Sequence, residues 1–424
     1  MIFLHAADIH LDSPLRGLPE YEGAPVEEIR NATRAAFRNM IDLAIGRRVD
    51  FLIIAGDLYD GNWRSYDTGL VFREQMSRLD KTGIPVFIVH GNHDAASRIT
   101  KGLTMPANVT VFSHRKAETH VIEELGVALH GQSFKTQHVT ENLSAGYPDR
   151  VADLFNIGVL HTAADGREGH APYAPCSTAE LTAKGYDYWA LGHIHNREIL
   201  SEDPPIVFPG NIQGRHIREE TTDGKGCTLV SVDEAGYMEL VHEPLDTVRW
   251  RFLEVDLSGT ETIGDIVAQV FRELTTAHEA ADDRLLAARI RLTGETPMHG
   301  QLLSDPDQLV NEIRGAAMDA AVGEIWIEKL IQDTRPVTSI EDMSTRGDSL
   351  GDVARILQGL PDEPETRSAL IGELEPIFSK LPADVTDRFP DIRAVLEDEE
   401  AMSDLMRQAS ELALSRLAKA EVPE

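Results

Sequence analysis

Runs of apolar residues alternate with segments of helical periodicity at the start of the chain. Residues 2–7, 51–55 and 85–89 are almost continuously apolar, which is typical of strands buried on both faces. Residues 26–47 and 68–82 carry apolar positions three and four residues apart, as amphipathic helices do. This order of strand, helix, strand, helix and strand predicts an α/β sheet whose site lies at the strand ends.

Shorter strands follow and make the predicted sheet mixed. Leu125-Gly126 separates two short β-type runs, which indicates a hairpin. Another strand is expected to end at His161, and a short helix is expected over residues 179–184. Further strands of this first domain are predicted at residues 186–191, 206–211, 227–232 and 238–242.

A different pattern begins at Arg249. Strand and helix patterns alternate as a small β-α-β-α-β module, with strands at 251–257, 287–292 and 324–330 and helices at 263–280 and 307–321. Beyond Pro336 the periodicity is helical and the composition acidic. We therefore expect three parts: a large α/β domain at 1–248, the module at 249–336, and a helical acidic C-terminal region at 337–424.

Five short motifs share one arrangement, in which an apolar run ends in residues that can bind a metal ion. Carboxylate oxygens and imidazole nitrogens are suitable ligands for divalent ions. In an extended chain, residues two apart point to the same side, so the first motif can offer two ligands to one ion. The motifs are Asp8-Ile9-His10, Gly56-Asp57-Leu58-Tyr59-Asp60, Gly91-Asn92-His93-Asp94, the lone His161, and Gly192-His193-Ile194-His195.

These residues suit the hydrolysis of a phosphodiester by two metal ions. Two divalent ions roughly 3.5–4 Å apart can activate a water and neutralise charge on the phosphate. Such a pair needs a bridging carboxylate, and Asp57 at the end of the second strand is the candidate. We expect one ion to be held by Asp8, His10, Asp57 and His195, and the other by Asp57, Asn92, His161 and His193.

His93 has no metal ligand role in this scheme. It is therefore free to contact the scissile phosphate and to protonate or orient the leaving oxygen. Either Asp60 or Asp94 could fix its tautomer. Arg215 and His216 follow the last motif, and either a phosphate contact or an ordinary salt-bridged loop would explain them.

The composition limits the class of protein. The net charge of −31 and pI near 4.8 argue against a nucleic-acid-binding protein, because affinity for phosphate backbones comes mainly from Lys and Arg. Two divalent ions with two carboxylate ligands, however, leave about +2 of local charge to attract a phosphate. Cys176 and Cys227 match no disulfide or zinc spacing, which favours a reducing cytoplasm. We expect neither a leader peptide nor a membrane-spanning segment.

The motifs in this order resemble those of the calcineurin-like metallophosphoesterases. Gly91-Asn92-His93-Asp94, the β-α-β-α-β module and the opening run from His5 to Leu15 further resemble the SbcD-type double-strand-break-repair nucleases, most closely the bacterial YhaO-like branch. The resemblance implies a four-layer α/β sandwich, Mn(II), His93 as the catalytic histidine with Asp60, and a cap that contacts DNA. It also implies an SMC-like coiled-coil ATPase as partner, in DNA repair.

Several alternatives remain open. Asp60 stands where some relatives carry histidine, so exonuclease and endonuclease activity are both expected outcomes. A phosphodiesterase acting on nucleotides or other small esters would use the same metals, with the module shielding a small pocket. A subunit that mainly tethers DNA ends would retain the ligands and cleave little. A homodimer is also left open, and no membrane association is expected.

Overall fold

The computed structural model divides the chain into two compact units. The first comprises Met1–Phe252, Ala277–Arg289 and Gly323–Glu328, and the second Leu253–Thr276, Ile290–Val322 and Lys329–Glu424. The structure describes residues 1–11, 13, 25–60, 67–96, 105–166, 173–282, 284–378, 380, 396 and 398–420. None of the helices described over these residues is both long and apolar enough to span a bilayer. The three-part division expected from the sequence stays a prediction.

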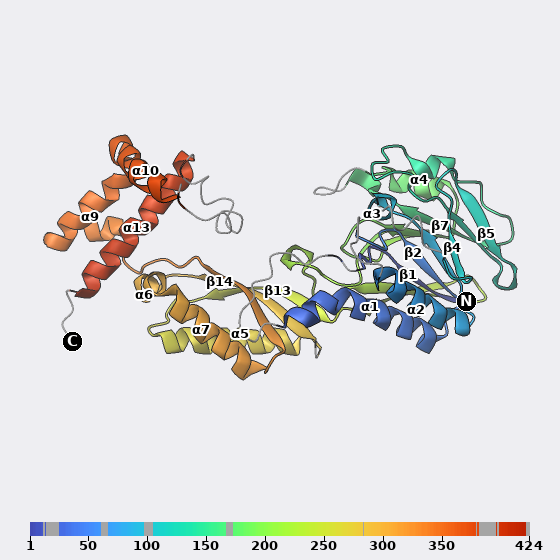
Figure 1. The fold of residues 1–424 in the computed structure, drawn as a ribbon, viewed down its shortest axis with the longest axis horizontal. Coiled ribbons are helices and arrows are strands. Elements are labelled where there is room, and N and C mark those ends of the chain that lie inside the picture. Colours follow the sequence, from blue (N-terminus) through green and yellow to red (C-terminus); the bar gives the residue numbers. More distant parts are fainter. Residues whose placement is uncertain are drawn as a thin grey trace. The chain divides into compact units, whose positions relative to one another are not determined.

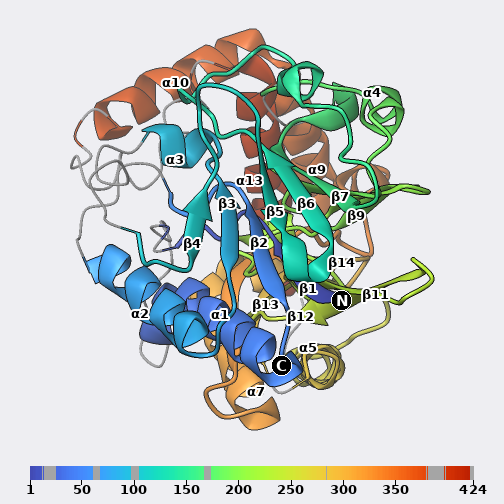
Figure 2. The same cartoon turned by 90° about the vertical axis from the view of Figure 1, so that its right-hand side faces the viewer.

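The first unit contains two six-stranded sheets (Figure 2). The first sheet has the order β12-β11-β1-β2-β3-β4, in which β1 to β4 are parallel, β11 is antiparallel to β1, and β12 is antiparallel to β11. Its strands are β1 (Ile2–Ala6), β2 (Phe51–Ala55), β3 (Val86–Val89), β4 (Val109–Val111), β11 (Gly226–Val232) and β12 (Met238–Pro244).

The second sheet has the order β5-β6-β7-β8-β10-β9. Its inner strands β6, β7, β8 and β10 are parallel, and antiparallel strands form both edges. The bounds are β5 (Glu118–Ile122), β6 (Val127–Gly131), β7 (Phe155–His161), β8 (Tyr188–Gly192), β9 (Glu198–Glu202) and β10 (Pro205–Phe208). The predicted hairpin and mixed sheet are confirmed.

Helices cover the outer face of each sheet. The helices α1 (Val26–Arg47) and α2 (Asp67–Lys81) pack on the first sheet through the apolar stripes seen in the sequence. The short α4 (Thr178–Ala183) packs on the second sheet, and Figure 2 shows it on the side away from α1 and α2. A buried apolar layer lies between the sheets, with Phe51 and Ile53 from one and Ile157 and Val159 from the other. The four-layer α/β sandwich is confirmed.

The strands β13 (Val248–Asp256), β14 (Leu285–Thr293) and β15 (Ile325–Gln332) form a third sheet. The helices α5 (Ile263–Glu279) and α7 (Pro306–Ala320) connect them, so the β-α-β-α-β module exists as predicted. The carboxylate of Asp305 caps α7 by accepting a hydrogen bond from Gln308 N.

The last part of the chain is helical (Figure 1). Buried Ile340, Leu350, Ala354 and Leu414 form its small core. The helices described there are α8 (Ile340–Ser344), α9 (Ser349–Gly359), α10 (Pro364–Phe378) and α13 (Glu399–Ala420). A further short helix, α6 (His299–Ser304), lies earlier in the chain, directly before α7.

Candidate dimetal site

All seven predicted metal ligands are brought together in the first unit. They lie at the carboxyl ends of β1, β2 and β3 in one sheet and of β7 and β8 in the other. Three groups form in which the potential ligand atoms lie within 4.8 Å of one another: Asp8, His10 and His195; Asp57, His161 and His193; and His10, Asp60 and His93. Asn92 joins the second group, since its Oδ1 lies 3.0 Å from His161 Nε2. Their roles as ligands stay a prediction.

Two histidines face each other in the first group. The Nε2 atoms of His10 and His195 are 3.2 Å apart. The Nδ1 atom of His195 lies 2.7 Å from Glu219 Oε1 and donates its proton there, which leaves a lone pair on Nε2. Burial lowers the pKa of His10 to about 3, so that imidazole is neutral. Its Nδ1 lies 3.6 Å from Asp60 Oδ1 and has no hydrogen-bond partner among the described residues.

This arrangement fits a cation. If each imidazole directs a lone pair into the space between them, a positive ion stabilises both. Asp8 supplies negative charge beside them, and its two oxygens accept a hydrogen bond from His193 N at 3.1 and 2.9 Å. Burial, together with the charge of Asp57, raises the pKa of Asp8, and a bound divalent ion would reverse this effect.

His161 occupies the centre of the second group. Its Nδ1 donates to the carbonyl oxygen of Ala55 at 3.0 Å, so Nε2 points at Asp57 Oδ2, 3.4 Å away. Burial alone would lower the pKa of His161, but the charge of Asp57 outweighs it and raises the pKa to about 9. A proton on Nε2 thus supplies positive charge next to the carboxylate of Asp57. A divalent ion would replace that proton, since a metal-bound histidine must be deprotonated.

His93 lies beside the two groups with a fixed tautomer. Its Nδ1 is 2.8 Å from Asp60 Oδ1, which leaves Nε2 available to a substrate. Ser13 donates a hydrogen bond of 2.7 Å to the other oxygen of Asp60. Burial alone would lower the pKa of His93, but the hydrogen bond to Asp60 and the charge of Asp57 raise it. With a raised pKa the imidazole stays protonated to a higher pH, so it can donate a proton.

Asp94 has a different structural role from Asp60. Its buried carboxylate accepts backbone hydrogen bonds from Leu58, Tyr59 and Gly91 at 3.2, 2.9 and 3.0 Å. Asp94 therefore ties the loop after β2 to the loop after β3, and Asp60 is the carboxylate that orients His93. The segment that contains Asp94 also differs from the loop expected from the sequence, because Asn92 begins a short helix, α3 (Asn92–Ala96).

The backbone is strained at several of these positions. Asp8, His10, Asp57 and His193 have φ values of 50°, 45°, 50° and 109°. Residues other than glycine rarely adopt positive φ, and each such residue costs on the order of 1–3 kcal/mol. Such strain commonly occurs at functional sites, where the surrounding structure holds the chain in place.

Gly91 allows the two sheets to approach at the site. A Cβ atom at this position would lie 2.3 Å from Asp57 Oδ1 and 2.8 Å from His161 Nε2. Any side chain at residue 91 would therefore displace a carboxylate and an imidazole from opposite sheets. The Gly-Asn-His-Asp motif therefore needs glycine at this position, because a larger residue would clash with these two side chains.

Glu219 is a residue that the sequence analysis did not identify. It lies in the turn Ile217–Glu219 and is 5% exposed. Its carboxylate accepts hydrogen bonds from His195 Nδ1, from Arg215 Nη2 at 3.1 Å and from Asn211 Nδ2 at 2.9 Å. Burial alone would raise the pKa of Glu219, but the hydrogen bond from His195 and the charge of Arg215 hold it well below its usual range.

Arg215 and His216 differ in their surroundings. The Arg215 side chain is 15% exposed and also reaches Ser13 Oγ at 3.4 Å through Nη1. It thus connects the partner of His195 to the partner of Asp60. His216 is 53% exposed, with Nε2 3.7 Å from Glu219 Oε1. Asp12, Pro14 and Leu15 of the opening motif lie outside the described residues.

Replacing Glu219 by glutamine is expected to weaken metal binding by roughly 10–100-fold, because carboxylates that orient metal-bound histidines have effects of this size. The amide keeps the size of the side chain but removes the charge opposite His195 and Arg215. Titration of the metal-free protein with Mn(II) followed by calorimetry measures the affinity. Glu220→Gln is the matched control, since Glu220 accepts a hydrogen bond from Phe252 N instead. Equal affinities for the two variants would contradict the role of Glu219.

Comparisons with known proteins agree with this geometry. The family model described as calcineurin-like phosphoesterase matches residues 1–197, and the one described as the middle domain of metallophosphoesterase YhaO matches residues 250–335. An uncharacterized metallophosphoesterase, YhaO of Bacillus subtilis, is 32% identical over 380 residues, which cover 87% of this chain and 91% of the relative.

More distant relatives carry the name DNA double-strand break repair protein Mre11. The protein of Methanopyrus kandleri is 26% identical over 300 residues, covering 64% of this chain and 61% of its own length. That of Saccharolobus solfataricus is 28% identical over 242 residues, covering 54% and 59%. The donor clusters, the family match over the sandwich and the similarity to YhaO over most of both chains lead to one conclusion: this chain belongs to the calcineurin-like metallophosphoesterases.

Proposed function

We propose that this protein is a Mn(II)-dependent DNA nuclease that hydrolyses phosphodiester bonds and acts in DNA repair. The observation that carries the proposal is the pair of donor clusters with His93 held beside them by Asp60. Two divalent ions bound there would activate a water and neutralise charge on the phosphate. Asp8, His10, Asp57 and His195 would hold one, and Asp57, Asn92, His161 and His193 the other.

The chain's own residues supply the proton in this proposal. Asp60 accepts the Nδ1 proton of His93 and favours the doubly protonated imidazolium, whose Nε2 proton would pass to the leaving oxygen. The charge of Asp60 also stabilises the protonated imidazole before transfer. Gly91 lets Asp57 and His161 lie close together, since a side chain at position 91 would displace both.

Two observations support DNA as the substrate class. Relatives named for double-strand-break repair match 54–64% of this chain at 24–28% identity. A bound metal pair would also give the site a local positive charge in spite of the net charge of −31. That acidity favours a second candidate, a phosphodiesterase for nucleotides or other small esters, because an acidic surface repels long polyanions.

The direct test is Mn(II)-dependent cleavage of end-labelled linear duplex DNA, measured beside hydrolysis of bis-p-nitrophenyl phosphate. We expect both activities in the wild-type protein and their loss after treatment with EDTA. Hydrolysis of the small ester without DNA cleavage would overturn the nuclease proposal and favour the second candidate. Absence of both would overturn phosphodiester hydrolysis altogether.

The helical C-terminal region is proposed to dock an SMC-like coiled-coil ATPase in a reducing cytoplasm. Several large apolar side chains are exposed on its helices, including Ile356 at 64%, Leu405 at 39% and Leu417 at 45%. Exposed apolar side chains on helices are typical of surfaces that bind another helix.

Truncation near residue 336 is expected to keep hydrolysis of the small ester and to abolish binding of the ATPase, since the candidate docking helices follow this position. Co-purification with an SMC-like ATPase co-expressed in the same cells measures binding. Leu405→Glu with Leu417→Glu in the full chain serves as a second variant that does not depend on folding of the truncated protein. Unchanged co-purification of both variants would exclude this docking role.

A further inference from the structure

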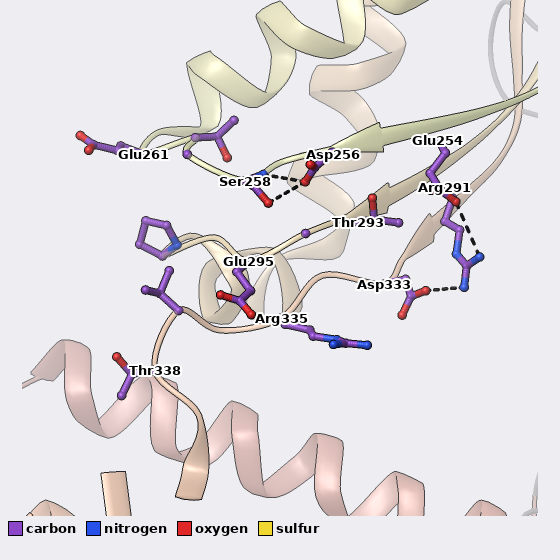
Figure 3. Close-up of a pocket in the computed structure, with 15 residues that line it drawn as sticks. Glu254, Asp256, Ser258, Glu261, Arg291, Thr293, Glu295, Asp333, Arg335 and Thr338 are labelled. Carbon is purple, nitrogen blue, oxygen red and sulfur yellow. Dashed lines mark hydrogen bonds and ion pairs between the residues drawn. The ribbon is translucent and has the colours of Figure 1, made fainter. Parts of the chain in front are cut away.

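A broad cavity in the second unit is unsuited to a phosphate. It has a volume of about 1110 Å³, and its lining residues include the carboxylates of Glu254, Asp256, Glu261, Glu295 and Asp333. Figure 3 shows that Arg291, one of its two guanidinium groups, is already paired with Asp333 and Glu254. The other, Arg335, cannot balance the remaining carboxylates. This surface would repel the backbone of DNA.

A smaller pocket in the first unit has the opposite character. It has a volume of about 310 Å³ and is lined by His114, Arg115, Lys135 and His138, with one carboxylate, Glu141. We call these four basic residues the basic loop pocket. All four side chains are exposed, and neither Arg115 nor Lys135 forms an ion pair with a carboxylate in the part of the chain that the structure describes. The chain as a whole has 71 acidic and 40 basic residues, so a pocket with Arg115 and Lys135 against one carboxylate is opposite in sign to the net charge.

The residues of this pocket lie on two loops, one after β4 and one after β6, and hydrogen bonds fix both loops to the dimetal site. Ser133 donates to Phe112 O at 2.6 Å, and Ser133 N donates to Ser113 O at 3.1 Å, which joins the loops to each other. The Ser133 hydroxyl also accepts a hydrogen bond of 2.9 Å from His90 N, and Phe134 N donates to His90 O at 2.9 Å. His90 directly precedes Gly91, so the backbone that positions the Gly-Asn-His-Asp motif also positions the pocket.

Aromatic contacts connect the pocket to the metal ligands. The Phe134 ring packs edge-on against His161, with centroids 5.4 Å apart. The centroid of the Tyr173 ring lies 5.6 Å from that of His138 and 5.5 Å from that of His193. The phosphates of one strand are spaced roughly 3.4 Å apart along the axis of B-DNA. A strand with its scissile phosphate at the donor clusters could therefore reach His138 within a few nucleotides.

We infer that the basic loop pocket binds backbone phosphates of the DNA strand that is being cleaved, a few nucleotides from the scissile bond. This inference rests on the proposed nuclease function and names the surface that would hold its substrate. The contact is electrostatic and independent of base sequence, because Arg115 and Lys135 offer charge and donors to phosphate oxygens. The inference also places DNA binding on the first unit, which carries the donor clusters, and not at the acidic cavity of the second unit.

The test is charge reversal in the holoenzyme, with Arg115→Glu and Lys135→Glu combined. We expect kcat/KM on linear duplex DNA to fall by roughly 10–100-fold, while hydrolysis of bis-p-nitrophenyl phosphate stays unchanged because that ester does not reach the pocket. The neutral pair Arg115→Gln and Lys135→Gln should lower the slope of log binding constant against log salt by about 1 for each lost contact. The control is Arg73→Glu with Lys81→Glu, exposed residues of α2 with the same change of net charge.

The outcomes separate the two proposals. If the wild-type protein cleaves DNA and the pocket variant cleaves it equally well, the inference is wrong and the nuclease function stands. An equal loss in the α2 control would also overturn the inference, because the effect would then follow net charge alone. If the wild-type protein hydrolyses the small ester but no DNA, the nuclease function fails and the inference fails with it.

Discussion

Asp57→Ala is expected to lose metal occupancy and all measurable phosphodiesterase activity. Asp57 is buried between the two donor groups, with Oδ2 3.4 Å from His161 Nε2 and Oδ1 accepting a hydrogen bond from His93 N at 2.9 Å. Its loss would remove the negative charge that both ions share and would release the turn that carries His93. We expect Mn(II) affinity to fall by more than the roughly 100-fold upper limit for residues that only orient a ligand.

Metal content of the purified variant, measured by inductively coupled plasma mass spectrometry after loading with Mn(II), tests this directly. Asp80→Ala on the exposed surface of α2 is the control, since it removes a carboxylate that belongs to none of the donor groups. Thermal unfolding in EDTA should be similar for the variant and the wild-type protein if the fold is intact. Two bound ions per chain in Asp57→Ala would disprove the bridging assignment.

His93→Ala is expected to lower kcat by roughly 10²–10⁴-fold, the range for loss of a general acid, while metal binding stays intact. The His93 ring stacks edge-on against His10 with centroids 4.9 Å apart, but no atom of the proposed ligand set depends on it for a hydrogen bond from its side chain. Single-turnover cleavage of DNA and of bis-p-nitrophenyl phosphate gives the rate, and a Mn(II) titration gives the affinity.

A double-mutant cycle with Asp60 sharpens this test. Asp60 acts through His93, because its Oδ1 lies 2.8 Å from His93 Nδ1. Asp60→Asn should therefore reduce kcat in the wild-type background and have little further effect when His93 is already alanine. Retained activity in His93→Ala, or loss of its metal, would refute the role of this histidine. Additive losses in the double variant would show that Asp60 acts on something other than His93.

The positions of the ligands could be predicted because each one follows a strongly apolar run. Phe51-Leu52-Ile53-Ile54-Ala55 is fully buried, and Asp57 follows at its end. Parallel strands bring their carboxyl ends to one edge of a sheet, so Asp8, Asp57 and Asn92 had to be neighbours once the sheet was assumed. The chemistry of the donors then indicated metal ions without knowledge of the packing.

Residues that act through another residue could not be found in this way. Glu219 contacts His195 across 24 positions, and Ser13 contacts Asp60 across 47. Neither contact follows from periodicity, because the partners are far apart in sequence and are brought together only by tertiary packing. The spacing of Arg215 and Glu219 by four residues was the one local signal, and it is equally typical of an ordinary surface pair.

The choice between Asp60 and Asp94 was undecided for a related reason. Asp94 directly follows His93 in the sequence, and Asp60 lies in the loop after β2. The sequence contains no information on which of these two carboxylates points toward the His93 ring. The structure separates them by their hydrogen bonds, since three buried backbone N–H groups from the loops after β2 and β3 require an acceptor and Asp94 provides it. The positive φ of His193 could not be predicted from the sequence either.

The distribution of donors over both sheets has a mechanical consequence. Asp8 and Asp57 belong to strands of one sheet and His161 and His193 to strands of the other, so ions bound between them would act as reversible cross-links through the sandwich. Asp8 and His193 are 185 residues apart, and opening the sheets would require the ions to leave first. At a metal concentration 100 times the dissociation constant, such a link adds roughly 2.7 kcal/mol to the free energy of unfolding for each site. The metal supply of the cell would then set the lifetime of the folded catalytic unit as well as its activity.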